Sequence, residues 1–219
     1  MLQGAGGMIV WPSEFLAGAR RLCDQYGTLL IADEVLTGFG RTGRMFACEH
    51  AAVRPDLICL SKAITAGYLP LGATATTEAI YEAFLSEDRS KTFFHGHSYT
   101  ANPLACAVGL ASLDLFRDNA VLERVQALER QLRTGLEPLR RVPCVGDVRV
   151  IGGVGIVELE SGSTDYLHQL GPRLAAAFLD RGLLLRPLGN VLYFMPPYVI
   201  TESEVAWVLE QISEVLAGI

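Results

Sequence analysis

Lys62 stands out chemically, because the chain makes almost no other use of lysine. Sixteen arginines occur against two lysines. Arginine stays protonated in proteins, whereas a desolvated lysine can lose its proton and become an amine nucleophile. Lys62 follows the apolar run 57–60, where a buried strand is predicted to end, and a lone ammonium is costly to bury there. The other lysine, Lys91, lies in the polar run 86–91 and is predicted to be a solvated loop residue.

A carboxylate follows another apolar run of the same kind. Residues 29–32 are continuously apolar, as in a strand buried on both faces of a sheet, and Asp33 comes directly after them. Ligands of parallel α/β sheets lie beyond the carboxyl ends of the strands. Asp33 and Lys62 could therefore form a structural ion pair, or they could contact one ligand. In the second case the amine forms a Schiff base with an aldehyde cofactor, and the carboxylate keeps a pyridine nitrogen protonated, as pyridoxal phosphate requires.

The hydrophobic pattern changes character near residue 118. Helices are predicted at 12–26, 77–85, 102–116, 120–139, 166–180 and 202–216, and strands at 29–32, 57–60, 72–76, 145–151, 154–159, 183–186 and 191–194. Parallel α/β character in residues 1–118 gives way to α+β character in residues 119–219, which predicts two domains. Three strands are too few for a doubly wound sheet. The chain is therefore expected to be part of a longer protein, with an internal methionine as its first residue.

Composition narrows the class of function. The formal net charge is −6 and no basic stripe occurs, which argues against nucleic-acid binding. No apolar run approaches the roughly 18 residues that span a bilayer, and the N-terminus does not have the layout of a signal peptide. Five widely spaced cysteines without a C-x-x-C pair favour reduced thiols and a cytoplasmic location. The pair His95 and His97 has no neighbouring cysteine or carboxylate, so no metal site is expected.

Two long segments, residues 30–43 and 55–63, resemble the signature of the class-III aminotransferases, which use pyridoxal phosphate. The resemblance implies a fold-type-I α/β protein, with part of the large parallel-sheet domain in residues 1–118 and the small α+β C-terminal domain in residues 119–219. It also implies that Asp33 binds the pyridinium nitrogen, that Lys62 forms the Schiff base and later moves the proton, and that Val35 packs on one face of the ring. A homodimer is implied as well.

Within the family, further segments are similar to the members that transfer an amino group from S-adenosylmethionine to 8-amino-7-oxononanoate in biotin synthesis. These are residues 3–8, 46–51, 95–106, 146–149, 186–189 and 193–198. The similarity implies that Ser98 reaches the cofactor phosphate of the neighbouring subunit and that the Gly96 backbone lines the substrate channel. It further implies that Arg186 holds the substrate carboxylate through its planar fork and that Tyr193 lies near the substrate.

Several alternatives stay open at this point. Ser98 could be a turn residue before the helix that begins near residue 102, and Arg186 could form a surface ion pair. Some relatives use lysine in place of S-adenosylmethionine as the amino donor. The chain could also belong to another class-III enzyme, such as an ω-amino-acid aminotransferase. The family's glycine- and serine-rich phosphate loop at a helix N-terminus is not found in this sequence. A fragment that binds no cofactor and catalyses nothing is therefore a further alternative.

Overall fold

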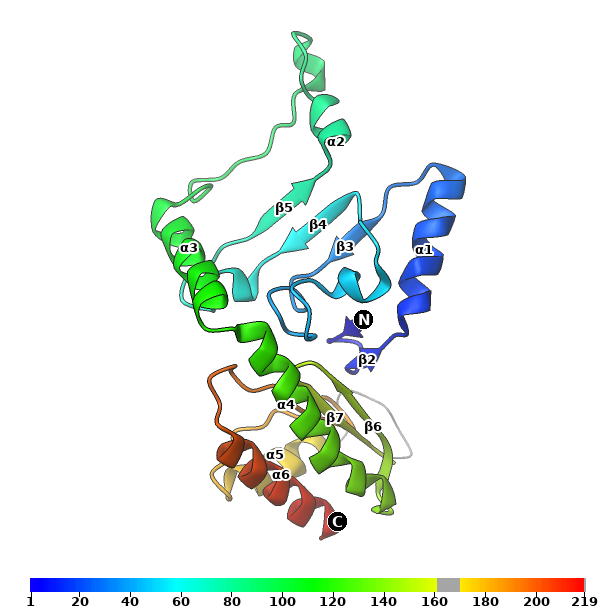
Figure 1. Cartoon of the computed structure of the whole chain (residues 1–219), viewed down its shortest axis with the longest axis vertical. Coiled ribbons are helices and arrows are strands. Elements are labelled where there is room, and N and C mark those ends of the chain that lie inside the picture. The colour runs from blue at the N-terminus through cyan, green and yellow to red at the C-terminus, as the bar shows by residue number, and fades with distance from the viewer. Residues whose placement is uncertain (161–169, 219) are drawn as a thin grey trace. The chain divides into compact units, whose positions relative to one another are not determined.

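The computed structural model describes residues 1–160 and 170–218 of the chain, which divides into two compact units (Figure 1). The N-terminal unit comprises Met1, Pro12–Phe39 and Arg44–Ala120, and the C-terminal unit comprises Leu2–Trp11, Gly40–Gly43 and Val121–Ile219. The units divide between Ala120 and Val121, and two short segments of the first part belong to the C-terminal unit. The assignment of residues 1–118 and 119–219 to a large and a small domain stays a proposal.

The N-terminal unit opens with helix α1, Ser13–Tyr26, which confirms the helix predicted at 12–26. Pro12 precedes it in an extended conformation, and Gly27 ends it in the left-handed region at φ 62°. Glycine adopts that conformation without steric cost, and its amide donates to the carbonyl of Cys23. The boundaries of α1 thus follow directly from the proline and the glycine in the sequence.

Three strands form the sheet of this unit in the order β3-β4-β5. Strand β3, Ile31–Asp33, pairs in parallel with β4, Leu57–Leu60, and β4 pairs in antiparallel fashion with β5, Ala73–Thr76. The sheet is therefore mixed, and the prediction of parallel pairing is wrong at β5. The strand predicted at 29–32 begins two residues later and ends one residue later, so that Asp33 is the last residue of β3.

The predicted burial of these strands on both faces is also wrong within the described part of the chain. Ile31 is 60% exposed, β4 is half-buried along its length, and β5 is exposed throughout. Helix α1 likewise has no buried residue, and its Phe15 is exposed. The apolar pattern in this unit marks faces that are accessible to solvent in this chain.

Two further helices complete the N-terminal unit: α2 at Glu78–Glu82, which is shorter than the helix predicted at 77–85, and α3 at Pro103–Asp118. An extended segment, interrupted by the 3-10 helix Arg89–Lys91, connects α2 to α3 (Figure 1). The Asn102 side chain caps α3 by accepting a hydrogen bond from Leu104 N at 3.0 Å. Pro103 occupies the first turn, where its missing N–H costs nothing.

The C-terminal unit is built on an antiparallel sheet in the order β6-β7-β8. Its elements are β6 (Val145–Ile151), β7 (Val154–Leu159), β8 (Val191–Phe194), α4 (Val121–Leu136), α5 (Leu170–Leu179), α6 (Glu202–Ala217) and a small hairpin of β1 (Leu2–Gln3) and β2 (Ile9–Val10). The three predicted strands that form the sheet are confirmed. The strand predicted at 183–186 is wrong, because these residues are irregular. Of the helix predicted at 166–180, residues 166–169 lie outside the described residues.

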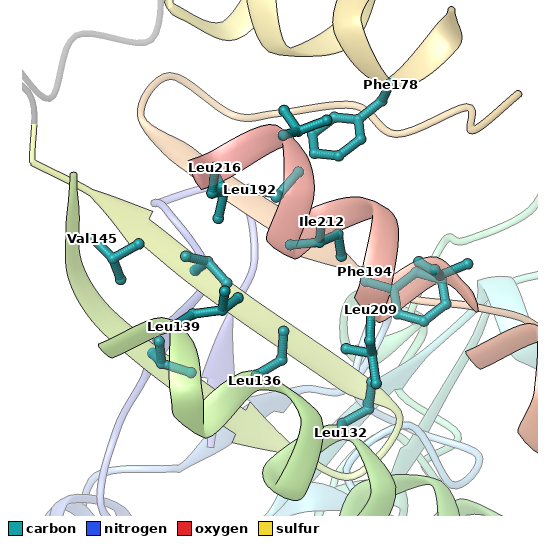
Figure 2. Close-up of a cluster of buried hydrophobic side chains, with 14 of the residues drawn as sticks. Leu132, Leu136, Leu139, Val145, Phe178, Leu192, Phe194, Leu209, Ile212 and Leu216 are labelled. Carbon is teal, nitrogen blue, oxygen red and sulfur yellow. The ribbon is translucent and has the colours of Figure 1, made fainter. Parts of the chain in front are cut away.

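The hydrophobic core of the C-terminal unit lies between this sheet and its helices (Figure 2). Leu128, Leu132 and Leu136 recur every fourth residue along α4 and are all buried, as expected for one face of a helix. Ile212 and Leu216 repeat the same spacing on α6. This unit therefore buries its apolar pattern, in contrast to the N-terminal unit. None of the described helices is both long enough and apolar enough to cross a membrane.

Leu132→Ala should destabilise the C-terminal unit, because Leu132 is 0% exposed within the core. Removing a fully buried leucine side chain leaves a cavity, and the expected loss in the free energy of unfolding is about 2–5 kcal/mol. Leu184→Ala is the matched control, since Leu184 is 88% exposed and should change stability by less than about 0.5 kcal/mol. Urea denaturation followed by tryptophan fluorescence measures this unit, because both tryptophans, Trp11 and Trp207, belong to it. Equal losses in the two variants would contradict the assigned core.

Candidate active site

Two neighbouring strand ends bring a carboxylate and an amine to one edge of the sheet. In the parallel pairing of β3 and β4, Asp33 lies opposite Cys59. Lys62 follows Cys59 by three residues, just after β4 ends at Leu60. Because parallel strands run in the same direction, their carboxyl ends meet at the same edge. The structure therefore places the two positions as the sequence predicts, while the roles of their side chains stay predictions.

The Asp33 carboxylate is exposed and is turned back on its own loop. Its Oδ1 accepts a hydrogen bond from the backbone amide of Val35 at 3.0 Å. Among the described residues no ion pair joins Asp33 to Lys62, so the structural ion pair that the sequence left open is not formed. One lone pair is used locally, and the remaining acceptor capacity of Asp33 faces solvent. Val35, the predicted packing residue, is half-buried.

Lys62 occupies an unusual backbone conformation. Its φ is 44°, in the left-handed region that residues with a side chain seldom adopt, and it opens the 3-10 helix Lys62–Thr65. Such a conformation costs on the order of 1–3 kcal/mol and is often found at functional sites. The side chain is exposed, so the prediction that this lysine is buried is wrong within the described chain. A strained lysine at a strand end is consistent with a positioned amine.

Hydroxyl groups on both sides of Lys62 tie its turn to the following loop. Ser61 Oγ donates to the carbonyl of Leu71 at 2.8 Å, and Thr65 Oγ1 donates to the carbonyl of Leu69 at 2.5 Å. Thr65 is only 1% exposed, so its hydrogen bond forms away from water, where an unsatisfied hydroxyl would be costly. These two bonds fix both ends of the turn that carries Lys62.

Helix α3 supports the same turn. The Ser112 hydroxyl donates a long hydrogen bond of 3.4 Å to the carbonyl of Ala63. Gly109, one turn earlier, brings the helix close to the carbonyl of Ile64, where a Cβ on the glycine would lie 3.5 Å from the oxygen. Neither contact follows from the sequence, because only the fold brings α3 to the Lys62 turn.

Glu34 is a buried carboxylate that the sequence analysis left without a role. It is 3% exposed and accepts hydrogen bonds from the hydroxyl of Thr37 and from the amides of Ala47 and Cys48, at 3.0 and 2.8 Å. Successive residues of a strand point to opposite sides, so the adjacent Asp33 and Glu34 reach different environments. Glu34 is thereby an internal anchor that holds the residues directly after β3 to the 3-10 helix Ala47–Ala51. The two adjacent acidic residues, Asp33 and Glu34, are the feature of the sequence that could have indicated a role for Glu34.

The pKa of the Cys48 thiol depends on Glu34. Burial, the negative charge of Glu34 and a side-chain hydrogen bond to Glu34 raise the pKa of Cys48 to about 11. All three effects disfavour the thiolate, which is the reactive form of cysteine. Cys48 is therefore expected to be a slow nucleophile near neutral pH.

Ser98 and Gly96 lie in the segment that precedes α3. Both are exposed, and a Cβ added to Gly96 would meet no atom within 4 Å. Ser98 begins a turn in which the amide of His97 donates to Thr100 Oγ1 at 2.9 Å. The reading of Ser98 as a turn residue is thus confirmed, and its exposed hydroxyl is available for the predicted contact with a phosphate.

Arg186 and Tyr193 belong to the C-terminal unit. Arg186 is exposed, and within the described ranges it forms no ion pair, so a surface ion pair does not explain it. Tyr193 lies on β8 opposite Ile156 and is half-buried. Their proposed contacts with the substrate stay predictions.

Comparison with known proteins identifies the family. Residues 1–216 match the family described as aminotransferase class-III. The chain belongs to the class-III aminotransferase family. A protein of Synechococcus elongatus is 49% identical over 99% of this chain and 50% of its own length. A protein of Geobacter sulfurreducens is 48% identical over 96% of this chain and 48% of its own length. Both are named adenosylmethionine-8-amino-7-oxononanoate aminotransferase. The chain thus spans about half the length of the curated relatives it matches.

Solved structures of aminotransferases share this fold. The adenosylmethionine-8-amino-7-oxononanoate aminotransferase of Methanocaldococcus jannaschii matches with a TM-score of 0.93 at 38% identity, over 99% of this chain and 52% of that one. An amine transaminase from an uncultivated Pseudomonas species, solved in its pyridoxal-phosphate-bound form, matches with a TM-score of 0.92 at 37% identity, over 99% and 50% of the two chains. The likeness establishes a fold-type-I α/β architecture for this class-III chain.

Glu34→Gln should make Cys48 more reactive. The substitution removes a negative charge and a hydrogen bond that raise the pKa of the thiol, so the thiolate fraction at a given pH should increase. The measurement is the rate of alkylation of Cys48 between pH 7 and 9, followed by peptide mass spectrometry. Glu82→Gln, at an exposed position on α2, is the control and should leave the rate unchanged. An unchanged rate in Glu34→Gln would show that Glu34 does not govern this thiol.

Proposed function

We propose that this chain carries the lysine and the aspartate of a pyridoxal-phosphate-dependent aminotransferase. The proposed reaction converts 8-amino-7-oxononanoate to 7,8-diaminononanoate in biotin synthesis, with S-adenosylmethionine as the amino donor. The observation that carries the proposal is the parallel pairing of β3 and β4, which sets Asp33 and Lys62 at one sheet edge. Relatives that are 43% to 49% identical are named for this acceptor and this donor.

The groups at this edge fit pyridoxal phosphate chemically. A carboxylate can accept a hydrogen bond from a protonated pyridine nitrogen, and a primary amine can condense with the aldehyde. Asp33 and Lys62 do not neutralise each other within the described structure, so both stay available to a ligand. When bound, the cofactor supplies an electron sink for the carbanion that forms on the substrate.

The proposed site residues have separate tasks. The Asp33 carboxylate would hold the ring nitrogen in its protonated form. The Lys62 amine would hold the aldehyde group and would carry the proton from the amine-bearing carbon of the donor. The hydrogen bonds of Ser61 and Thr65 orient this amine through its backbone. Val35 would pack against one face of the ring.

The substrate contacts are proposed from the family. The planar guanidinium of Arg186 suits bidentate binding of the substrate carboxylate, and Tyr193 would lie beside the substrate. In a homodimer, the Ser98 hydroxyl would reach the cofactor phosphate of the neighbouring subunit, and the Gly96 backbone would line the substrate channel. The five free cysteines support the proposed cytoplasmic location.

A second candidate is an ω-amino-acid aminotransferase. The ω-transaminase of Thermomicrobium roseum matches this chain with a TM-score of 0.92 at 36% identity, over 99% of this chain and 49% of that one. A panel of amino acceptors separates the two candidates. Amination of 8-amino-7-oxononanoate supports the biotin assignment, whereas turnover confined to ω-amino acids as donors, with no amination of 8-amino-7-oxononanoate, rejects it. Replacing S-adenosylmethionine by lysine in the same assay identifies the donor.

Pyridoxal phosphate should label this chain selectively at Lys62. After incubation with stoichiometric pyridoxal phosphate, borohydride reduction should fix a pyridoxyl group on the Lys62 peptide, which peptide mass spectrometry detects. Lys62→Ala should abolish the label, because Lys91, the only other lysine of the sequence, lies in the 3-10 helix Arg89–Lys91 and not at the strand ends that carry Asp33. Asp33→Asn should lower the yield at limiting cofactor, since an amide cannot supply the negative charge that stabilises the pyridinium.

Lys91→Ala is the matched control and should retain the label. Equal labelling of Lys62 and Lys91 in the unaltered chain would contradict the proposal, because it would show reaction with any exposed amine. Absence of label from Lys62 would favour the cofactor-free alternative.

A further inference from the structure

The signature loop Gly40–Gly43 contains an arginine whose role the proposed reaction does not explain. Arg41 is half-buried within the C-terminal unit, and burial lowers the pKa of its guanidinium. Within the part of the chain that the structure describes, no carboxylate forms an ion pair with it. A cation in such a setting is costly unless other groups compensate for the lost water. The groups that contact the Arg41 guanidinium therefore indicate the role of this residue.

Backbone carbonyls and an aromatic ring compensate for the Arg41 charge. Its Nη1 donates to the carbonyl of Pro196 at 3.0 Å, and the carbonyl of Gly153 lies at 3.5 Å from the same atom. The guanidinium carbon lies 4.5 Å from the centroid of the Tyr198 ring. A planar guanidinium can stack on a ring while its edge donates hydrogen bonds, which the ammonium of lysine cannot do in the same way.

The backbone of the loop is held as closely as the side chain. The amide of Gly153 donates to the carbonyl of Arg41 at 3.0 Å. Gly152 has φ 51°, and a Cβ placed on it would lie 2.5 Å from that carbonyl oxygen. Only glycine fits at this position, for both its conformation and its contact. The turn between β6 and β7 therefore fits directly against the loop.

A third element completes the attachment. Gln126 on α4 donates from Nε2 to the carbonyl of Gly43 at 3.3 Å. The loop also closes on itself, since the amide of Gly43 donates to the carbonyl of Gly40 at 2.9 Å. The loop Gly40–Gly43 is thus held by three elements: the β6–β7 turn, the segment 196–198 and helix α4. This loop follows the segment that carries Asp33 and Val35.

We propose that Arg41 is a positioning residue that locks the signature loop onto the C-terminal unit and thereby fixes the chain that carries Asp33 and Val35 for cofactor binding. The part of this inference that concerns the cofactor rests on the proposed function. The part that concerns the loop rests only on the contacts of Arg41 and Gly152. The two parts can be tested separately.

Hydrogen exchange of the loop tests the lock on the chain without cofactor. Arg41→Ala and Gly152→Ala should each reduce the protection of the Gly43 and Gly153 amides by about tenfold, the effect of losing one typical hydrogen bond. Amides in β7 should keep their protection. Arg41→Lys should restore little, because lysine cannot stack and donate together.

Matched controls separate the lock from general effects. Arg44→Ala removes an exposed arginine that directly follows the loop. Gly182→Ala places alanine at φ 78° with no atom within 4 Å of its Cβ, so it shares the backbone strain of Gly152→Ala without the contact. Both controls should leave the Gly43 and Gly153 amides protected. Unchanged protection in Arg41→Ala and Gly152→Ala would overturn the proposal.

Pyridoxyl labelling of Lys62 tests the link to the cofactor. Arg41→Ala should need about tenfold more pyridoxal phosphate for half-maximal labelling, in proportion to the expected loosening of the loop, whereas Arg44→Ala should match the unaltered chain. If Arg41→Ala loosens the loop in hydrogen exchange but leaves the labelling of Lys62 unchanged, the proposal that Arg41 positions residues for the cofactor is wrong. If the unaltered chain takes no label at Lys62, the proposed function and the cofactor link both fail, and hydrogen exchange still decides the lock.

Discussion

The candidate site depends on the parallel register of β3 and β4. Hydrogen bonding of these two strands sets Asp33 opposite Cys59, and from that pairing Lys62 follows at the same edge. An antiparallel pair would place the two residues at opposite edges, with no common ligand within reach. The connection from Glu34 to Asp56 allows the two strands to run in the same direction. It returns the chain to the end of the sheet where β3 begins, so that β4 starts beside Ile31. Asp56 itself secures this return, because its Oδ2 accepts hydrogen bonds at 2.7 Å from Arg20 and from the amide of Leu30.

The adjacent acidic residues at the end of β3 divide two tasks between them. Asp33 is exposed and uses one oxygen to accept a hydrogen bond from Val35, which leaves acceptor capacity at the sheet edge. Glu34 is buried and accepts hydrogen bonds from one hydroxyl and two backbone amides. A buried carboxylate that accepts hydrogen bonds from several donors is well compensated, so it can fix a loop. The inner carboxylate thus stabilises the loop, and the outer one is left for a ligand.

The sequence predicted most of what depends on local pattern. Pro12 and Gly27 located α1, and the extended segments predicted in the C-terminal unit located β6, β7 and β8. The edge shared by Asp33 and Lys62 followed from the prediction that the two strands run parallel. The burial of the strands in the N-terminal unit was predicted wrongly. An apolar run indicates that a surface is suited to burial, but it does not show which part of this chain covers that surface. The contacts of Arg41, Thr65 and Ser112 were missed, since each joins residues that only tertiary structure brings together or that carry no distinctive motif.

The contrast between apolar burial and local hydrogen bonding explains how the Lys62 turn is maintained. The sheet beside it has exposed faces, so hydrophobic burial contributes less there than in the core of the C-terminal unit. Hydroxyl-to-carbonyl bonds from Ser61 and Thr65 act within ten residues and need no distant surface. Such bonds strengthen as the local dielectric falls. Any ligand or polypeptide surface that excludes water from this edge would therefore hold the left-handed conformation of Lys62 more firmly. Occupation of the site and order in its lysine turn are expected to reinforce each other.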